Sequence, residues 1–566
     1  MKNGLPLASA KFVCLDGGRQ GRGHCRKAFL LSCSAIAFLG AWDITQAAGL
    51  EYASGGQGFG STGGDGGGGN GRGGGGGFFA SYHNGQEPLA GVGGDGGNGF
   101  TAGASANNGV GGTGTTVLTG SGTYGGGAVG GNGTNGAVGN GGGANDEGGG
   151  GGGGGGAAGL IYSPLSGATY DFLGSANGGN GGNGGNGGPY SGSNTYDGGG
   201  GGGGGAALWV DGSNATFSIG AGHVLTGGNG GTGGNGGNGN GRFGGGGGGG
   251  DGFLLLGDGN TITNDGTLTG GNGGADGASS SAIGGTGGSG LRVLGNNNVI
   301  YNSGSITGGL SGDGVTRANA ITFDGGTNVL ELQSGSTITG NVVASGASDT
   351  LRLGGSGNVT FDVSQIGTAA QYQGFESYTK AGSSTWTLTG TTTAATPWAI
   401  NAGTLAVSSD GNLGAAGGIS FDGGTLQYVT GFTSSRAVTL NAGGGTLDTN
   451  GSNATLSGNI TGTGDLTKTG TGTLTLAGTN THTGGTTISV GTLQIGSGGT
   501  SGSIAGNVTN NGTLTFNRSD AVSFGGDVSG GGNLTQAGTG TTILTGDSTH
   551  TGGTTISVGT LQIGSG

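Results

Sequence analysis

Cysteine, proline and charged side chains are scarce in this 566-residue sequence. The three cysteines, Cys14, Cys25 and Cys33, all lie near the start, so the rest of the chain can form neither a disulfide framework nor a cysteine-based metal or catalytic site. Only 8% of the residues are charged, whereas about a quarter are charged in an average soluble domain. Five prolines and the lack of a strict Gly-X-Y period exclude a collagen triple helix. These absences argue against an ordinary globular enzyme domain.

Glycine is abundant instead, with 169 copies, and it is concentrated in the first half of the chain. Over residues 49–156, glycine tracts contain so few apolar residues that burial could not offset the conformational entropy lost on folding. We therefore predict an irregular, low-complexity region there. Gly-Gly-Asn triplets between Gly178 and Gly188 would permit stacked polyglycine-type helices, but the interpretation we favour is a flexible loop.

Residues 1–48 have the pattern of a secretory signal peptide with a long basic front end. Basic residues, including Arg26 and Lys27, precede an apolar run over 28–42 and a small-residue exit at Ala47 and Ala48. A membrane anchor would need about 20 apolar residues, so we predict cleavage after Ala47 or Ala48. A lipoprotein signal ending at Cys33 and a twin-arginine signal are the less favoured alternatives.

The chain that remains after such cleavage is strongly acidic. Residues 1–48 hold six of the 15 basic and two of the 28 acidic residues, which leaves nine basic, 26 acidic and a formal net charge of −17. An acidic surface repels nucleic acid. We therefore predict no nucleic-acid partner, and we interpret Arg72-Gly73-Gly74 as a loop fragment.

Short segments of period two predict β-strands in the rest of the chain. Leu474-Thr475-Leu476 is typical, because alternation places aliphatic side chains on one face and hydroxyls on the other. Over residues 157–319, we predict β-rungs interrupted by glycine-rich loops. Two of these rungs, 253–271 and 291–309, align without gaps, and a looser version runs over 208–228.

A short repeat continues over residues 320–566. Gly-Thr-Leu recurs there at steps that are mostly close to 20 residues, and residues 481–498 return unchanged at 549–566. Short strands at such a step fit a parallel β-helix, in which each coil buries its apolar face on the next. A β-sandwich array is the rival, but its domains need about 100 residues each. The fold class that we predict is all-β, a parallel β-helix with an irregular glycine-rich N-terminal half.

The C-terminal residues resemble the autotransporter-associated β-strand repeat of type V secreted passengers. The match begins at Lys468-Thr469-Gly470, continues through Leu474 and ends at 496. A second copy spans about 536–564, and a degenerate one spans about 380–407. The resemblance implies an exported bacterial passenger at the cell surface or outside the cell, with an outer-membrane β-barrel translocator as a partner. No barrel follows Gly566, so we expect either a truncated record or a separately encoded translocator.

The candidate catalytic residues lie within repeats or glycine-rich segments. Gly499-Thr500-Ser501 is similar to the surroundings of a subtilisin-type nucleophile, but no His-Gly-Thr segment accompanies it. His83 and His223 lie in glycine-rich or repeat context, and His482 and His550 are equivalent positions of the identical copies. Such positions indicate structural turns, so we predict no catalytic residue.

Cofactor and metal sites are equally poorly supported. Residues 246–254 satisfy the calcium-binding nonapeptide pattern once, and a glycine tract does so by chance. The two lysines after residue 48, Lys380 and Lys468, do not follow phosphate-loop glycines. We predict no cofactor and no metal ligand.

Three functions fit these observations. The one we favour is a non-enzymatic passenger in adhesion, aggregation or biofilm formation, which would contact glycans or proteins of a host or neighbouring cell and could self-associate. The alternatives are an exported polysaccharide-acting β-helix enzyme and a structural glycine-rich matrix protein.

Overall fold

In the computed structural model, the described residues are 128–137, 152–162, 164–188, 197–237, 243–277, 284–415 and 417–564, with four short strands before residue 128. The predicted signal peptide lies outside these residues. No α-helix occurs in the described ranges, and short 3₁₀ helices include η2 (Val363–Gln365) and η3 (Asp410–Leu413). None of the described helices is long and apolar enough to span a bilayer. Before residue 100, β1 (Phe78–Phe79) pairs antiparallel with β2 (Val92–Gly93).

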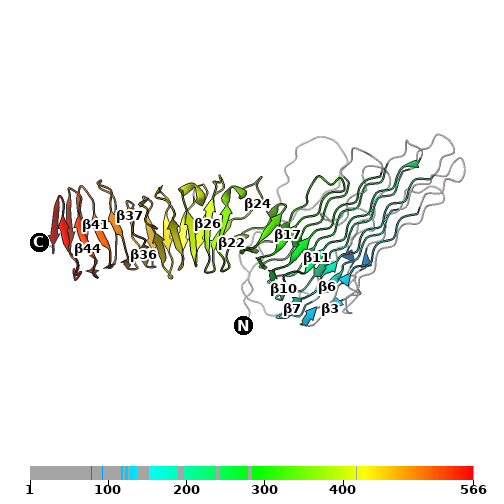
Figure 1. Cartoon of the computed structure of the whole chain (residues 1–566), viewed down its shortest axis with the longest axis horizontal. Helices are drawn as coiled ribbons and strands as arrows, with labels where there is room; N and C mark the ends of the chain where they lie inside the picture. The colour runs from blue at the N-terminus through cyan, green and yellow to red at the C-terminus, as the bar shows by residue number, and fades with distance from the viewer. Residues whose placement is uncertain are drawn as a thin grey trace, which may run out of the picture. The chain divides into compact units, whose positions relative to one another are not determined.

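From β3 onward the chain winds through parallel sheets and adds one strand to each sheet in turn (Figure 1). Sheet 1 contains β3 (Val117–Leu118), β6 (Leu160–Tyr162), β9 (Leu208–Val210), β12 (Phe253–Leu255), β15 (Leu291–Val293), β18 (Ile321–Phe323), β21 (Val342–Ala344) and β24 (Tyr372–Gln373). Sheet 2 contains β4 (Gly122–Tyr124), β7 (Thr169–Phe172), β10 (Thr216–Ile219), β13 (Thr261–Asn264), β16 (Val299–Asn302), β19 (Val329–Leu332), β22 (Thr350–Leu353), β25 (Ser377–Lys380), β27 (Trp398–Ile400), β29 (Ile419–Phe421), β32 (Val438–Leu440) and β35 (Ile460–Gly462). Sheet 3 contains β5 (Ala128–Val129), β8 (Ala176–Asn177), β11 (Val224–Thr226), β14 (Thr267–Thr269), β17 (Ser305–Thr307) and β20 (Thr337–Thr339).

Three further parallel sheets carry the winding to the C-terminal coils. Sheet 4 contains β23 (Val359–Asp362), β26 (Thr385–Thr389), β28 (Thr404–Val407), β30 (Thr425–Tyr428), β33 (Gly445–Asp448), β36 (Leu466–Thr469), β38 (Thr486–Ile488), β40 (Val508–Asn510) and β43 (Val528–Ser529). Sheet 5 contains β31 (Thr433–Ser434), β34 (Ala454–Leu456), β37 (Thr473–Leu476), β39 (Thr492–Ile495), β41 (Thr513–Phe516), β44 (Asn533–Gln536) and β46 (Thr554–Ile556). Sheet 6 contains β42 (Ala521–Phe524), β45 (Thr541–Leu544) and β47 (Thr560–Ile563). The all-β, parallel β-helix class is thereby confirmed.

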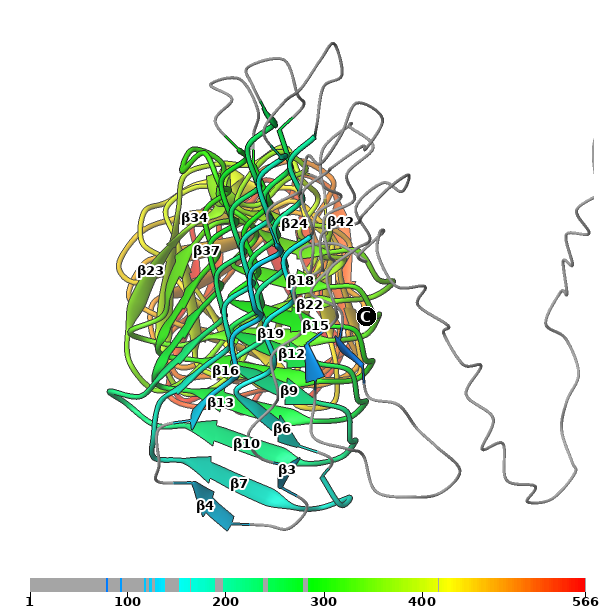
Figure 2. The same cartoon turned by 90° about the vertical axis from the view of Figure 1, so that its right-hand side faces the viewer.

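The register also confirms the alignment of the N-terminal rungs. Phe253 lies opposite Leu291 in sheet 1, at the offset that the sequences predict, and Leu208 lies on the other side of Phe253. Figure 2 shows β4, β7, β10, β13 and β16 as successive steps of sheet 2. Thr216 pairs with Thr261, 45 residues on, whereas Val329 pairs with Thr350, 21 residues on. The coils therefore shorten along the chain as their glycine-rich segments shrink.

Alternating aliphatic side chains fill the interior in columns, as the period-two pattern predicts. In sheet 4 one such column runs through Trp386, Leu405, Leu426 and Leu447, all at most 2% exposed. Complete burial of one such side chain stabilises the fold by about 1.5–3 kcal/mol. Because each side chain contacts its equivalent in the next coil, the stability of each coil depends on its neighbours.

Asparagine side chains form a second kind of column, at the corner between sheets 1 and 2. The backbone N–H of Asn260 donates to Oδ1 of Asn298 over 2.8 Å, and that of Asn298 donates to Oδ1 of Asn328 over 2.9 Å. The N–H of Asn328 donates to Oδ1 of Asp349 over 2.7 Å. All four side chains are buried, so the column satisfies backbone donors that water cannot reach.

The glycine-rich stretches correct one of our expectations. The segment Gly178–Gly188 is not a flexible loop but an extended chain, hydrogen-bonded to its neighbours at every triplet. Asn180 N–H donates to Asn132 Oδ1 over 2.8 Å, and Gly181 N–H donates to Asn229 O over 2.8 Å. Gly182 N–H donates to Gly154 O over 2.7 Å. A period of three residues and hydrogen bonds between neighbouring segments are typical of polyglycine helices with polyproline II-like geometry. Such a helix forms no hydrogen bonds within its own segment.

Each long coil contains two such chains, an outgoing one after sheet 3 and a returning one before sheet 1. The outgoing chains include 130–137, 178–188, 227–237 and 270–277, and the returning ones include 152–159, 198–207, 243–252 and 284–290. They form the set of parallel traces in cyan and green in Figure 1. Gly202 of a returning chain donates to Gly182 of an outgoing chain over 2.8 Å, so the two kinds of chain are bonded to each other.

Close approach explains why these chains need glycine. A Cβ on Gly182 would lie 2.0 Å from Thr134 O, and one on Gly202 would lie 2.1 Å from Gly154 O. Both obstacles are backbone atoms that cannot rotate away. The low-complexity composition is therefore a packing requirement, and burial is achieved with backbone rather than with apolar side chains.

The C-terminal repeats advance by one sheet from copy to copy. Residues 379–407 contribute strands to sheets 2 and 4, residues 466–495 to sheets 4 and 5, and residues 534–563 to sheets 5 and 6. The strands of the identical segments therefore occupy different faces of the helix: β38 and β39 lie in sheets 4 and 5, and β46 and β47 lie in sheets 5 and 6. Gly-Thr-Leu likewise does not mark one column, because Thr446 lies in sheet 4 and Thr473 in sheet 5.

Candidate functional surface

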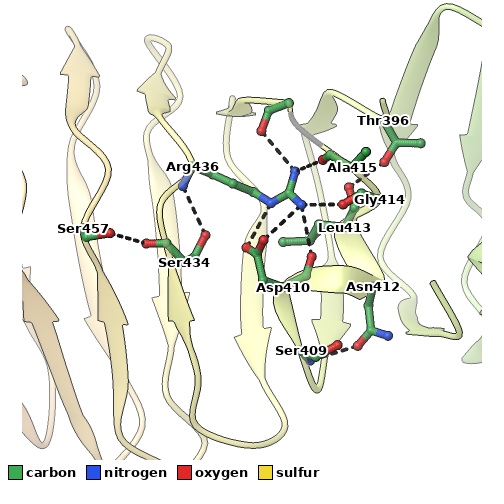
Figure 3. Close-up of polar contacts among 11 residues, drawn as sticks. Thr396, Ser409, Asp410, Asn412, Leu413, Gly414, Ala415, Ser434, Arg436 and Ser457 are labelled. Carbon is green, nitrogen blue, oxygen red and sulfur yellow. Dashed lines mark hydrogen bonds and ion pairs between the residues drawn. The ribbon is translucent and has the colours of Figure 1, made fainter. Parts of the chain in front are cut away.

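The most extensively bonded side chain in the described part of the chain is Arg436, which lies between β31 and β32 (Figure 3). Its Nε and Nη2 donate to the carboxylate of Asp410 over 3.0 and 3.2 Å. Nη1 donates to Ala415 O over 2.9 Å and to Gly417 O over 3.1 Å, and Nη2 donates to Gly414 O over 2.6 Å. The guanidinium therefore clamps η3 and the turn after it onto the following coil.

Burial makes this a structural contact. The side chain of Arg436 is 6% exposed and each of its nitrogens has an acceptor, so none is directed at a ligand. Removal of the guanidinium would leave the carbonyls that it serves unsatisfied, at a cost of about 1–3 kcal/mol for a buried group.

Arg518 binds the loop that contains Gly499-Thr500-Ser501. Nη2 donates to Thr500 O and Nη1 to Gly502 O, each over 2.5 Å, while Nε donates to Asp520 over 2.9 Å. Ser501 is exposed on this loop. Among the described contacts, Ser501 has no histidine partner.

Lys380 and Lys468 occupy equivalent interior positions of two repeats. Each replaces an aliphatic side chain in a column, Lys380 between Leu353 and Ile400, and Lys468 between Leu447 and Ile488. Both are completely buried. The sequence contains a signal for these positions, because they are the two lysines of the chain after residue 48 and both stand at the start of a repeat.

Each buried ammonium group bonds the two turns that its repeat stacks. Lys468 Nζ donates to Gly470 O over 2.6 Å and to Val490 O over 3.2 Å, and Lys380 Nζ donates to Gly382 O and Ala402 O, each over 3.1 Å. Burial lowers the pKa of both lysines to about 8, although nearby carboxylates oppose the shift.

The third repeat has glutamine at the equivalent position. Gln536 Nε2 donates to Gly538 O over 2.8 Å and to Gly540 O over 3.3 Å, and Thr542 Oγ1 donates to its Oε1 over 2.7 Å. An uncharged side chain can therefore bond the turn carbonyls at this position. This indicates that the lysines have a structural role.

The duplicated histidines also have structural partners. His482 is buried and its Nε2 lies 3.1 Å from Thr486 Oγ1, while His550 repeats the contact with Thr554 over 3.0 Å. Burial lowers the pKa of His482, so the neutral ring is the favoured form. His223 is half-buried beside Gly220, and His83 lies outside the described residues.

The calcium nonapeptide match is part of the glycine stack. Residues 246–250 belong to a returning glycine chain, and Phe253 is a core residue of β12. Asp251 is buried, and its Oδ1 accepts the N–H of Ser289 over 2.7 Å. No cluster of three or more histidine, cysteine, aspartate or glutamate side chains suited to a metal ion occurs in the described residues.

Regular rows of uncharged polar side chains cover the outside of the coils. The longest threonine row crosses sheet 4 and consists of Thr385, Thr404, Thr425, Thr446, Thr467, Thr487 and Thr509. Each is half-buried or exposed, and successive members lie on neighbouring strands about 4.8 Å apart. These rows, rather than a cleft, are the candidate functional surface.

A second set of rows lies on the outgoing glycine chains, where asparagine recurs with a period of three and Thr232 and Ala275 take two of the positions. Asn132, Asn180 and Asn229 are exposed in one row, and each accepts the backbone N–H of the equivalent residue in the next coil. Inside the stack, the backbone N–H groups are bonded to carbonyl oxygens of neighbouring glycine chains. On this exposed side the asparagine Oδ1 atoms take the place of those carbonyl oxygens. The triplet pattern of the sequence contains this signal, which our loop interpretation missed.

Comparison with known proteins gives two matches. A model of the passenger-associated-transport-repeat family matches residues 379–407, 466–495 and 534–563, which coincide with the three repeats predicted from the sequence. A stretch of 152 residues, 26% of this chain, is 55% identical to the adhesin BmaC autotransporter of Brucella suis biovar 1 (strain 1330). The match spans only 4% of that relative's length. No solved structure matches the chain.

Proposed function

We propose that this chain, which carries the repeats of exported autotransporter passengers and is displayed at the cell surface or outside the cell, acts as a non-catalytic adhesin. The observation that carries the proposal is the repetition of uncharged hydroxyl and amide side chains in rows along the coils. The adhesin name of the relative that shares 152 residues with the chain supports the same interpretation.

The mechanism we propose is adhesion through many weak contacts. A β-helix presents each outward side chain again about 4.8 Å further along, so a partner that binds one coil meets the same chemistry on the next. Linked weak contacts raise overall affinity by 10²–10⁴-fold when the geometry allows simultaneous engagement. Glycans or proteins of a host or neighbouring cell are the partners that such a surface suits, and contact between copies would produce aggregation.

The charged and titratable side chains support a role without catalysis. Arg436, Arg518, Lys380 and Lys468 all bond backbone carbonyls of the coils that they join. A catalytic group must instead reach a substrate atom. In this proposal these four side chains stabilise the coils, and the outer rows make the contacts.

The test compares a deletion strain with the same strain complemented by the intact gene. We expect complementation to increase attachment to host cells and to increase clumping, and we expect the purified chain to leave a panel of glycans and peptides uncleaved. Attachment and clumping that do not differ between the two strains would contradict the adhesin proposal. Cleavage of any panel member would favour the polysaccharide-acting enzyme or another exported enzyme.

A further inference from the structure

The outgoing glycine chains carry an uncharged face, which we call the asparagine platform. It consists of the exposed side chains of Asn132, Asn135, Asn180, Asn183, Asn186, Asn229, Thr232 and Asn272. Neighbours along one chain are three residues apart, or about 9 Å in polyproline II-like geometry. Neighbours on adjacent chains are about 4.8 Å apart, the usual spacing of hydrogen-bonded extended chains. The platform is therefore a two-dimensional array.

Hydrogen bonds determine which way the platform amides point. A backbone N–H can only donate, so the side-chain atom that receives it must be Oδ1. Asn180 N–H donates to Asn132 Oδ1 and Asn183 N–H donates to Asn135 Oδ1, each over 2.8 Å. The Nδ2 group therefore faces away from the bonded chain with two N–H donors. The hydrogen bonds of these four residues within the described part of the chain do not involve Nδ2.

The platform is also rigid, because the glycines beneath it pack backbone on backbone. A Cβ on Gly181 would lie 1.8 Å from Gly202 O, and one on Gly185 would lie 2.0 Å from Ala137 O. Donors held on such a base lose little further conformational entropy on binding, which favours affinity.

From this geometry we infer that the asparagine platform binds a neutral polysaccharide, whose hydroxyl and ring oxygens accept hydrogen bonds from the Nδ2 donors. The inference rests on the proposed adhesive function and assigns it to one surface and one class of partner. A polysaccharide offers acceptors along its whole length, so several rows can be engaged at once.

Two features of the platform favour this partner over others. Protein interfaces depend on buried aromatic and aliphatic anchors, whereas the platform consists of asparagine, threonine and glycine. A polyanion would also accept hydrogen bonds, but the chain has a formal net charge of −13 and would repel it. A neutral, acceptor-rich polymer satisfies both conditions.

The test is a pelleting assay of the full chain with microcrystalline cellulose, a neutral and insoluble probe. The platform variant carries Asn132→Asp, Asn183→Asp and Asn229→Asp, which keep an oxygen for the backbone N–H and replace the outward donor by an acceptor. The matched control carries Asn453→Asp, Asn459→Asp and Asn507→Asp, whose Oδ1 atoms accept backbone N–H groups over 2.8–2.9 Å on the C-terminal coils. We expect the platform variant to lose binding at least tenfold and the control to bind like the wild type.

A second variant separates the loss of donors from added charge. Asn183→Ala introduces the residue that the same row already has at Ala275, so the fold tolerates it. We expect Asn183→Ala combined with Asn180→Ala to weaken binding to cellulose as well. Equal losses in platform and control variants, wild-type binding in both platform variants, or platform-dependent binding to collagen-coated beads but not to cellulose would each overturn the inference. A wild-type chain that fails to bind cellulose while complemented cells still attach would overturn it and leave the adhesin proposal intact.

Discussion

The two interior lysines, Lys380 and Lys468, donate to backbone carbonyl groups and form no ion pair with a carboxylate among the described contacts. Lys468 and Lys380 have pKa values near 8 because burial penalises the charged form, whereas an unfolded lysine titrates near 10.4. Between about pH 8 and 10.4 the unfolded chain therefore binds more protons than the folded chain, and stability rises with pH. At neutral pH the burial of each charged lysine therefore lowers the free energy of unfolding.

Replacing a buried lysine by the uncharged pair of the third repeat should remove this desolvation cost. We expect Lys468→Gln combined with Leu474→Thr, which introduces the equivalents of Gln536 and Thr542, to abolish the part of the pH dependence between pH 8 and 10.4 that belongs to Lys468. The amount is roughly 1–3 kcal/mol in the free energy of unfolding. Urea unfolding midpoints at pH 7, 8, 9 and 10 measure it. The wild type serves as the control for tyrosine ionisation, and an unchanged slope in the variant would contradict the prediction.

The asparagine column at the corner of sheets 1 and 2 ends in a carboxylate, Asp349. Burial raises the pKa of Asp349, and the neighbouring Glu376 adds to the shift. The folded state therefore binds a proton more readily than the unfolded state, so stability falls as the pH rises above the ordinary range of aspartate. At neutral pH the ionised carboxylate is the costly member of its column.

We expect Asp349→Asn to stabilise the chain by about 1 kcal/mol at pH 7, since asparagine holds this place in the preceding coils at Asn328 and Asn298. Its amide could donate to Gly346 O, as Asn328 donates to Gly325 O over 2.8 Å. The gain should shrink towards pH 4, where Asp349 protonates. Thermal unfolding at pH 4 and pH 7 gives the comparison, and a loss of stability at pH 7 would show that the carboxylate is needed.

At the scale of the element, the glycine chains differ from strands in the substitutions that they tolerate. A strand tolerates exchange among aliphatic residues of similar volume, whereas many glycines of the outgoing and returning chains have a neighbouring backbone atom where a Cβ would lie. Gly182 illustrates this, because the obstacle 2.0 Å from its Cβ position is a backbone carbonyl.

We expect Gly182→Ala to destabilise the glycine stack by about 3 kcal/mol or more, beyond the usual cost of overpacking, because backbone has to move. Amide hydrogen exchange should accelerate in 178–188 and in the neighbouring chains 130–137 and 227–237, with little change in sheets 5 and 6. Gly499→Ala is the matched control, since a Cβ there meets nothing within 4 Å. Exchange that is unchanged by Gly182→Ala would mean that the chains are not packed as described.

At the scale of the whole molecule, identical sequences differ in burial because their neighbours differ. Ile488 is 0% exposed and Ile495 is 1% exposed, yet Ile556 and Ile563, the same residues of the second copy, are 53% and 66% exposed. The first copy is covered by the coil of β40 and β41, and no described strand pairs beyond β46 and β47. Coil stability is thus a property of position in the stack.

A further coil packed on β46 and β47 should protect their backbone N–H groups from exchange. We expect a chain extended after Gly566 by a copy of residues 499–548, the segment that covers the first copy, to slow amide exchange in β46 and β47 at least tenfold. A scrambled extension of the same composition is the control. Equal protection in both extended chains would show that neighbour contacts do not set the stability of this coil.

Several elements follow from local patterns. The repeats near 380–407, 468–496 and 536–564, the parallel β-helix and the pairing of 253–271 with 291–309 all result from period-two alternation and recurrence, which depend on residues close in sequence. The buried lysines and the asparagine platform do not. Their environment arises from residues one coil away, at offsets that range from 19 to 49 residues.

The sequence by itself determined the fold class, the position of the repeats and the absence of cysteine chemistry after residue 33, because composition and periodicity are properties of the chain alone. Only the tertiary structure decided that Gly-Gly-Asn triplets pack into hydrogen-bonded chains and that the strands of identical 18-residue segments lie on different faces. The reason is physical. An extended glycine chain has no hydrogen bonds of its own, so its order comes from its neighbours. Likewise the face that a repeat occupies depends on the accumulated length of all the coils before it.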